Sequence, residues 1–263
     1  MQAEGRCHLS TNLNFEVDWD ALVASNPFAL RISCSGFNQS LYGETHRGGD
    51  IEKVKRHMRA LSEARTRTGA TAQIHMLYHR YKNNLDDEKL MKVYCEKLGF
   101  ELRPVWAYLM SFEKNLAFAR EGRDAAILTD QDRATIDRLG MPLDKAYEAA
   151  KKYRDKPCLL LEDQVVLDFK GDVVLCCAVY DVKEHMIAPY LETPIVTIQS
   201  RKRVHPSCGL CMEQGNHVLG TYGTSEIEFL AVERVLNEYA AQIDFSRVLA
   251  TETKRRAAVA PAG

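Results

Sequence analysis

The sequence lacks the features that mark membrane, secreted and nucleic-acid-binding proteins. None of its segments approaches the roughly 18 consecutive apolar residues of a membrane-spanning helix, and its first residues lack the charged start and apolar stretch of a secretion signal. With 35 basic and 36 acidic residues the formal net charge is -1, so the chain as a whole has no field that attracts nucleic acid. These absences predict a cytoplasmic protein that binds neither a membrane nor nucleic acid.

Several site motifs are also missing. The chain contains no Walker phosphate-binding loop and no Gly-x-Gly-x-x-Gly fingerprint, and none of its 8 cysteines belongs to a Cys-x3-Cys-x2-Cys run. A reducing cytoplasm disfavours a disulfide framework, so clustered cysteines indicate metal or redox chemistry and scattered ones indicate packing. Cys7, Cys34 and Cys95 are scattered along the chain, and we expect them to be inert.

Four cysteines in the last third of the chain have spacing typical of metal ligands. Cys158 precedes a Lys-Gly-Asp turn at 170–172 and Cys176 follows it, while Cys208 and Cys211 form a Cys-x2-Cys knuckle. These four, the thiol quartet, suit either a tetrahedral zinc ion or a 4Fe-4S cluster, and ligand count does not separate the two. Four unrelated core thiols and a zinc ribbon are the alternatives, although a ribbon generally uses two Cys-x2-Cys pairs.

The neighbours of the quartet carry further expectations. If 173–177 is an extended strand, Cys176 and Cys177 point to opposite faces, so only one of them reaches the site. We assign Cys176 as the ligand because of its distance from Gly171, and expect Cys177 to be a small buried hydrophobe. The basic run at 201–203 is predicted to be a solvated patch near the site, where it would offset thiolate charge.

The first part of the chain alternates strand and helix patterns. Strands are predicted over 30–33, 72–78 and 100–110. Helices are predicted over 51–64, with Asp50 as N-cap, and over 86–98, ending at Gly99. This alternation predicts an α/β fold with parallel pairing, layered or closed into a partial barrel. Functional groups of such sheets lie at the carboxyl ends of strands, which places Ser33, Ser35, Tyr78–Arg80 and Tyr108 near the active face.

Composition and pattern divide the chain into four regions. They are an incomplete parallel barrel (1–112), a helical bridge (113–156), a small α+β cysteine-bearing domain (157–223) and a C-terminal helix with a tail (224–263). In the third region short strands are predicted over 159–161, 165–169 and 173–177. The last helix is predicted over 225–243, and the tail after Thr253 is expected to fray.

Several of these segments resemble a known family. Pro157-Cys158, the segment 167–177 with Gly171 and Cys176, and the segment 206–211 resemble the SPASM domain, in its short single-cluster form, of radical S-adenosylmethionine enzymes. That domain follows a partial (β/α)6 barrel. The resemblance implies a single auxiliary 4Fe-4S cluster, because no further cysteines follow the quartet, and it implies these ligands: Cys158, Cys176, Cys208 and Cys211.

The front of the chain is similar to the later half of the radical barrel. Residues 10–12 resemble the end of its third strand and residues 31–36 resemble the fourth. The resemblance implies that Ser33 and Ser35 face S-adenosylmethionine, although Ser35 stands where family members carry an acid. Arg47 is implied as the partner of the cofactor carboxylate, and a solvated loop charge is the alternative for it.

The missing Cys-x3-Cys-x2-Cys run is the departure from the family. Its three thiolates hold the cluster that cleaves S-adenosylmethionine, so this chain is expected to use that cofactor only if a complementing N-terminal fragment supplies the missing part. Three interpretations follow: a truncated or split radical enzyme, a stand-alone cluster protein that transfers electrons or docks a partner, and a zinc-stapled binding module. An open barrel edge predicts a complementing fragment or a homodimer.

Overall fold

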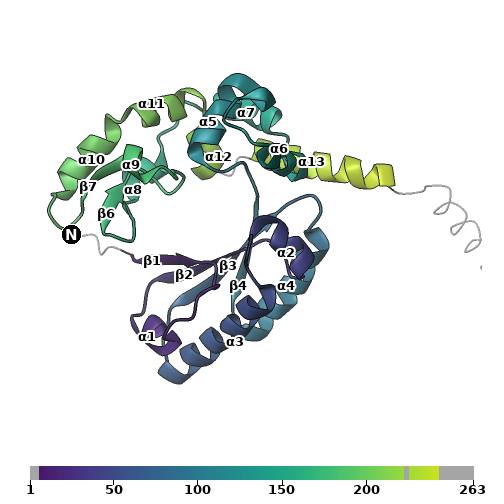
Figure 1. Cartoon of the computed structure of the whole chain (residues 1–263), viewed down its shortest axis with the longest axis vertical. Coiled ribbons are helices and arrows are strands. Elements are labelled where there is room, and N and C mark those ends of the chain that lie inside the picture. Colours follow the sequence, from purple (N-terminus) through teal and green to yellow (C-terminus); the bar gives the residue numbers. More distant parts are fainter. Residues whose placement is uncertain (1–5, 222–224, 243–263) are drawn as a thin grey trace, which may run out of the picture.

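A four-stranded parallel sheet forms the first half of the molecule (Figure 1). The computed structural model describes residues 6–221 and 225–242. The strands lie side by side in chain order: β1 (His8–Thr11), β2 (Ala29–Cys34), β3 (Gln73–Arg80) and β4 (Glu101–Trp106). The helices of this half are α1 (Trp19–Ala24), α2 (Gln39–Thr45), α3 (Ile51–Thr68) and α4 (Leu85–Leu98). The α/β class with parallel pairing is therefore confirmed.

The two long helices begin and end at residues with a clear physical role. The Asp50 carboxylate accepts hydrogen bonds from the backbone N–H groups of Glu52 and Lys53 at 2.8 and 3.2 Å, which confirms it as the N-cap of α3. Gly69 and Gly99 follow α3 and α4 with φ of 68° and 67°, a left-handed conformation that favours glycine. Both helices therefore lie close to where the sequence predicts them, with α3 extended to Thr68.

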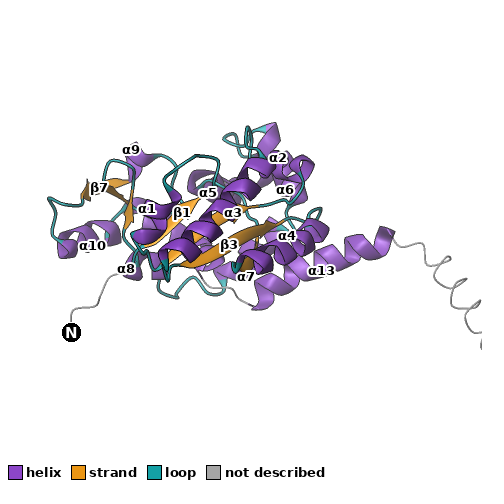
Figure 2. Cartoon of the chain, turned by 90° about the horizontal axis from the view of Figure 1, so that it is seen from below, coloured by secondary structure: helices purple, strands orange, loops and turns teal. Residues whose placement is uncertain are grey.

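The sheet has one apolar and one polar face. Residues that alternate along β2 and β3 are buried against α3: Leu30, Ile32, Cys34, Ile74, Met76 and Tyr78. Helices α1, α3 and α4 cover this face, and they lie in front of the strands when the chain is seen from below (Figure 2). The intervening residues point the other way because side chains alternate along a strand: Arg31, Ser33, His75, Leu77 and His79. Tyr78, predicted at the active face, thus belongs to the core.

Asn84 holds the carboxyl ends of β2 and β3 together. Its side-chain Nδ2 donates to the carbonyls of Ser35 at 2.7 Å and His79 at 2.9 Å, and its Oδ1 accepts from the backbone N–H of Tyr81 at 2.8 Å. The residue is only 1% exposed and immediately precedes α4. One amide side chain therefore satisfies three backbone groups at a buried strand–helix junction.

The second half, the C-terminal lobe (107–221 and 225–242), lies on the side of the sheet away from α1, α3 and α4 (Figure 1). It starts with α5 (Phe112–Glu121), α6 (Asp130–Arg138) and α7 (Leu143–Lys151), in the predicted helical bridge. An antiparallel sheet follows, with strands β5 (Val166–Leu167), β6 (Asp172–Val174) and β7 (Met186–Pro189). Its other helices are α8 (Leu159–Asp163), α9 (Val182–His185), α10 (Ile195–Arg203), α11 (Pro206–Glu213), α12 (Asn216–Thr221) and α13 (Ser225–Gln242).

Two local predictions for this lobe are wrong, the strand over 159–161 and the extent of the strand over 173–177. Residues 159–161 form helix α8 and not a strand, because three consecutive leucines fit a buried strand and a buried helix equally well. Strand β6 ends at Val174, so Cys176 and Cys177 lie beyond it in a turn. The Cys208–Cys211 knuckle is part of helix α11. The hairpin turn at Gly171, with φ of 86°, and the last helix are confirmed, while the tail after Thr253 lies outside the described residues.

Among the described residues, no helix is both long enough and apolar enough to cross a bilayer.

We expect Asn84→Ala to lower the free energy of unfolding by about 3 kcal/mol, because two carbonyls and one N–H at a buried junction lose their partner. Urea denaturation monitored by circular dichroism measures this change. Asn83→Ala is the matched control, since the exposed Asn83 amide reaches only the Glu44 carboxylate at 3.3 Å, and it should stay within about 0.5 kcal/mol of the wild type. Equal effects of the two substitutions would contradict this role for Asn84.

Candidate metal centre

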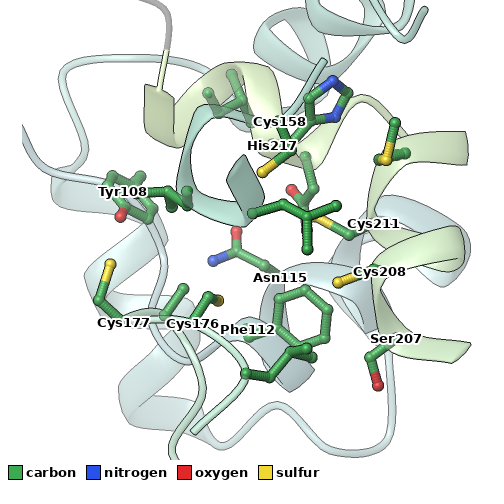
Figure 3. Close-up of a pocket in the computed structure, with 17 residues that line it drawn as sticks. Tyr108, Phe112, Asn115, Cys158, Cys176, Cys177, Ser207, Cys208, Cys211 and His217 are labelled. Atoms are coloured by element: carbon green, nitrogen blue, oxygen red, sulfur yellow. The ribbon is translucent and has the colours of Figure 1, made fainter. Parts of the chain in front are cut away.

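Five cysteines line one cavity of about 90 Å³ in the C-terminal lobe (Figure 3). They are Cys158, Cys176, Cys177, Cys208 and Cys211. The rest of the wall is mainly apolar, with Phe112, Leu175 and Met212 among its residues, and Tyr108 and Asn115 contribute polar groups. None of the described lining residues is a carboxylate. The donor set is therefore soft, as zinc and iron-sulfur sites require and as magnesium and calcium sites do not.

Three separate segments bring the thiol quartet to this cavity. Cys158 is the N-cap residue of α8, and Cys176 lies in the turn after β6. Cys208 and Cys211 are three apart on α11, and this spacing places two side chains on one face of a helix. The quartet thus surrounds the cavity from a helix start, a turn and a helix face, and Figure 3 shows the Cys177 side chain pointing away from these four.

Helix α11 begins with two residues that favour a helix start, an N-cap at His205 and a proline at 206. The His205 Nδ1 accepts a hydrogen bond from the Ser207 N–H at 3.3 Å, and Pro206 occupies the first turn, where its missing N–H costs nothing. The ring of His185 lies beside His205 and Ser207. Its Nε2 is 3.2 Å from the Ser207 hydroxyl. His205 therefore caps the helix that carries two thiols of the quartet.

The argument that selected Cys176 over Cys177 has to be corrected. Alternation along a strand does not apply, because both residues lie in a turn and both line the cavity. Cys177 is exposed, contrary to the expectation of a buried hydrophobe, while Cys176 is half-buried and packs against the core around Val173 and Val174. Burial, and not strand geometry, is what separates the two thiols.

Burial and mutual repulsion raise the pKa values of three quartet thiols, those of Cys176, Cys208 and Cys211, in the metal-free protein. Burial, together with the nearby thiolates of Cys176 and Cys158, raises the pKa of Cys208 to about 11, and Lys202 opposes this shift. Burial also raises the pKa of Cys211, with added contributions from the other three quartet thiolates. The four sulfurs are thus close enough to sense one another's charge, which is the condition that a shared cation would relieve.

Lys202 is the main departure from the predicted solvated patch. Its side chain is 0% exposed, and its Nζ donates to the carbonyls of Leu160, Leu161 and Gln164 at 3.2, 3.3 and 2.6 Å. Burial lowers the Lys202 pKa, and the quartet thiolates of Cys208, Cys176 and Cys158 counteract that shift. Arg203, by contrast, is exposed and pairs with Glu162 at 2.5 Å, as expected for a surface charge.

Of the residues implied as contacts of S-adenosylmethionine, Ser33 lies in β2 and Ser35 directly after it, whereas Arg47 belongs to a later loop. Ser33 is half-buried on the polar face of the sheet. The Ser35 hydroxyl bonds to the Thr45 hydroxyl, so it is already engaged within the protein. Arg47 is exposed in the loop between α2 and α3. The cofactor role of these three residues stays a prediction.

The polar face of the sheet also carries groups that the sequence did not connect. His75 Nε2 lies 3.3 Å from the Glu101 carboxylate on the neighbouring strand. His79 lies on the same face of the sheet, and burial lowers its pKa. The positive charge of Arg31, which lies on this face, partly offsets the rise that burial causes in the pKa of Cys177, a lining residue of the cysteine cavity.

Sequence reasoning missed two residues in or near the cavity, Asn115 and Lys202 in its buried position. Asn115 lines the cavity, and its Oδ1 accepts a hydrogen bond from the Tyr147 hydroxyl at 2.5 Å. Tyr108 lines it from the segment after β4, whereas it was predicted at the end of the sheet. The burial of Lys202 had no sequence signal, because it sits between two exposed arginines on α10.

Comparison of the chain with models of known protein families gives no match, and comparison with curated proteins gives none either. Within the part of the chain that the structure describes, no three His, Cys, Asp or Glu side chains lie close enough together to hold a single metal ion. The shared cavity of the five cysteines is therefore the structural observation on which the assignment of function rests.

The raised thiol pKa values predict that the metal-free protein loses stability in alkali. A folded-state pKa near 11, against an ordinary value of 9.0, favours folding below about pH 9 and loses that advantage as the pH rises toward 11. We expect the urea midpoint of the metal-free protein to fall between about pH 8 and about pH 10.5. Cys208→Ser with Cys211→Ser should reduce this fall, and an identical fall in the variant would argue against the assignment.

Proposed function

We propose that this chain binds one 4Fe-4S cluster through Cys158, Cys176, Cys208 and Cys211, and that it is a SPASM-type protein descended from a radical S-adenosylmethionine enzyme. The observation that carries the proposal is the gathering of these thiols, from segments up to 53 positions apart in the chain, around one cavity (158 to 211). Cysteine thiolates are the usual ligands of such clusters.

The cavity between the thiols favours a cluster over a single zinc ion. Zinc lies about 2.3 Å from each sulfur, so four thiolates close around it and leave no space between them. The quartet instead lines a volume of about 90 Å³ together with apolar side chains. A cuboidal cluster needs more space between its ligands than one zinc ion does, and the zinc-stapled module becomes the second outcome of the test below.

The chain's own residues have distinct tasks at such a site. The quartet would hold the cluster, Leu175 and Phe112 would exclude water from it, and Lys202 supplies a positive charge nearby. When bound, the cluster would supply one-electron transfer, with a potential set by charge, hydrogen bonds and exposure. The function supported best is therefore cluster binding with electron transfer or partner docking.

Cleavage of S-adenosylmethionine would need thiolates that the remaining cysteines do not provide. Cys34 and Cys95 are buried in the core beneath the sheet, and Cys7 is exposed before β1. Strand β1 pairs only with β2 among the described residues, so its other edge is open to a further strand. Radical chemistry on this scaffold would require a complementing fragment that carries the missing thiolates, because a second copy at that edge has the same cysteines.

We expect the anaerobically purified protein to contain about four irons and four sulfides per chain, with a broad brown absorption band. Cys208→Ala with Cys211→Ala should lose both iron and colour, because two of the four thiolates are gone. Metal and sulfide analysis with an absorption spectrum measures this.

The matched control is Cys177→Ala, which removes a thiol from the same cavity but not from the proposed ligand set. It should keep its iron. If the protein is colourless and contains one zinc ion per chain, the cluster proposal is overturned in favour of the zinc-stapled module. Loss of iron in Cys177→Ala with retention in Cys176→Ala would instead exchange the roles of these two neighbours.

A further inference from the structure

Lys202 occupies a position that is costly for a lysine. Its side chain is completely buried in the C-terminal lobe. None of the ion pairs among the described residues involves it, and the carboxylate of Glu162 is engaged by Arg203 at 2.5 Å. A buried ammonium group without a carboxylate partner is strongly unfavourable unless other negative charge lies close to it. The protein must therefore offer Lys202 an anionic surrounding of another kind.

Hydrogen bonds alone satisfy its donors but not its charge. The ammonium group has three N–H donors, and three carbonyls at the end of α8 accept them, from Leu160, Leu161 and Gln164. Carbonyls at a helix end have no intrahelical partner, so Lys202 acts as the C-terminal cap of α8. The other end of this five-residue helix is Cys158.

The position of Lys202 in the chain connects it with the rest of the quartet. It lies in the last turn of α10, three residues before His205, which caps the helix that carries Cys208 and Cys211. Leu160 and Leu161, whose carbonyls accept hydrogen bonds from the Lys202 Nζ, line the same cavity as the quartet. Thiolates at the quartet, which a bound metal would stabilise, counteract the lowering of the Lys202 pKa by burial.

We propose that Lys202 is the internal countercharge of the metal centre and the residue that positions Cys158 relative to Cys208 and Cys211. The proposal rests on the proposed function and extends it to a residue outside the ligand set. A zinc ion with four thiolates carries a net charge of about -2, and a cluster held by four thiolates is likewise anionic. One buried ammonium offsets part of that charge where water does not reach.

The test compares three variants of the full chain under anaerobic conditions, reconstituted with ferrous iron and sulfide. Lys202→Met removes the charge and the donors, Lys202→Arg keeps the charge, and Arg203→Met removes a charge from the same helix at an exposed, ion-paired position. The measurements are the rate of iron loss to a chelator, the midpoint reduction potential and the urea midpoints of the loaded and the metal-free protein.

We expect Lys202→Met to lose iron about 10- to 100-fold faster than the wild type, as for other residues that support metal ligands. Its reduction potential should fall, because an added electron is less favourable without the nearby cation. Lys202→Arg should restore the potential, and Arg203→Met should match the wild type. If Lys202→Met does not fold, Lys202→Gln, which keeps two N–H donors without the charge, replaces it in the same comparison.

The outcomes separate this inference from the proposed function. A wild-type chain that binds neither iron nor zinc overturns both. A wild type that binds metal, with Lys202→Met indistinguishable from Arg203→Met in iron loss and potential, overturns the role of Lys202 alone. An unchanged potential with an equal loss of stability in the loaded and metal-free forms would reduce Lys202 to a helix cap and would also overturn the countercharge.

Discussion

The parallel ladder that joins β1 to β4 in chain order is the constraint on which the arrangement of the rest depends. Crossovers between parallel strands are right-handed. Because each strand of this sheet is added at the same edge, in the order β1 to β4, the crossover helices lie on one face. That face takes the apolar residues of the sheet, and alternation sends Arg31, Ser33 and His75 to the other. The C-terminal lobe lies on this second side, so the sheet presents polar side chains toward it (Figure 1).

The cysteine-bearing part of the lobe is built from short elements around a small apolar core. Strand β5 has 2 residues, β6 has 3 and α8 has 5, all too short to be stable without tertiary support. Phe169 and Leu191 are 93% and 94% exposed, so part of its apolar surface lies outside the core. Small folding units with limited cores commonly depend on a metal or a disulfide. A metal held by the quartet would join α8, the β6 turn and α11, which are the same three segments that the core joins weakly.

The sequence predicts the sheet better than it predicts the site. Periodicity and caps locate α3 and α4, because Asp50 and Gly99 act locally and leave a local signal. Spacing finds the quartet, because ligands must occur in a recognisable order. The sequence fails where the decisive contact is distant: α8 was predicted as a strand, and Lys202, which caps it, is 38 positions from Gln164. No local pattern shows that one residue of a basic run is buried while its neighbours are exposed.

The choice of four ligands among five thiols shows how the two halves of the molecule are related. Cys176, Cys208 and Cys211 pack against the apolar core of the lobe, whereas Cys177 is exposed and senses the charge of Arg31 on the sheet. A thiol that becomes a ligand must lose its proton and give up water. A bound metal ion offsets both costs, and it does so most for a buried thiol, because the ion replaces the solvation that burial removes. An exposed thiol gains less from the same exchange. Cys177 therefore belongs to the boundary between the sheet and the lobe, and the four proposed ligands belong to the lobe alone.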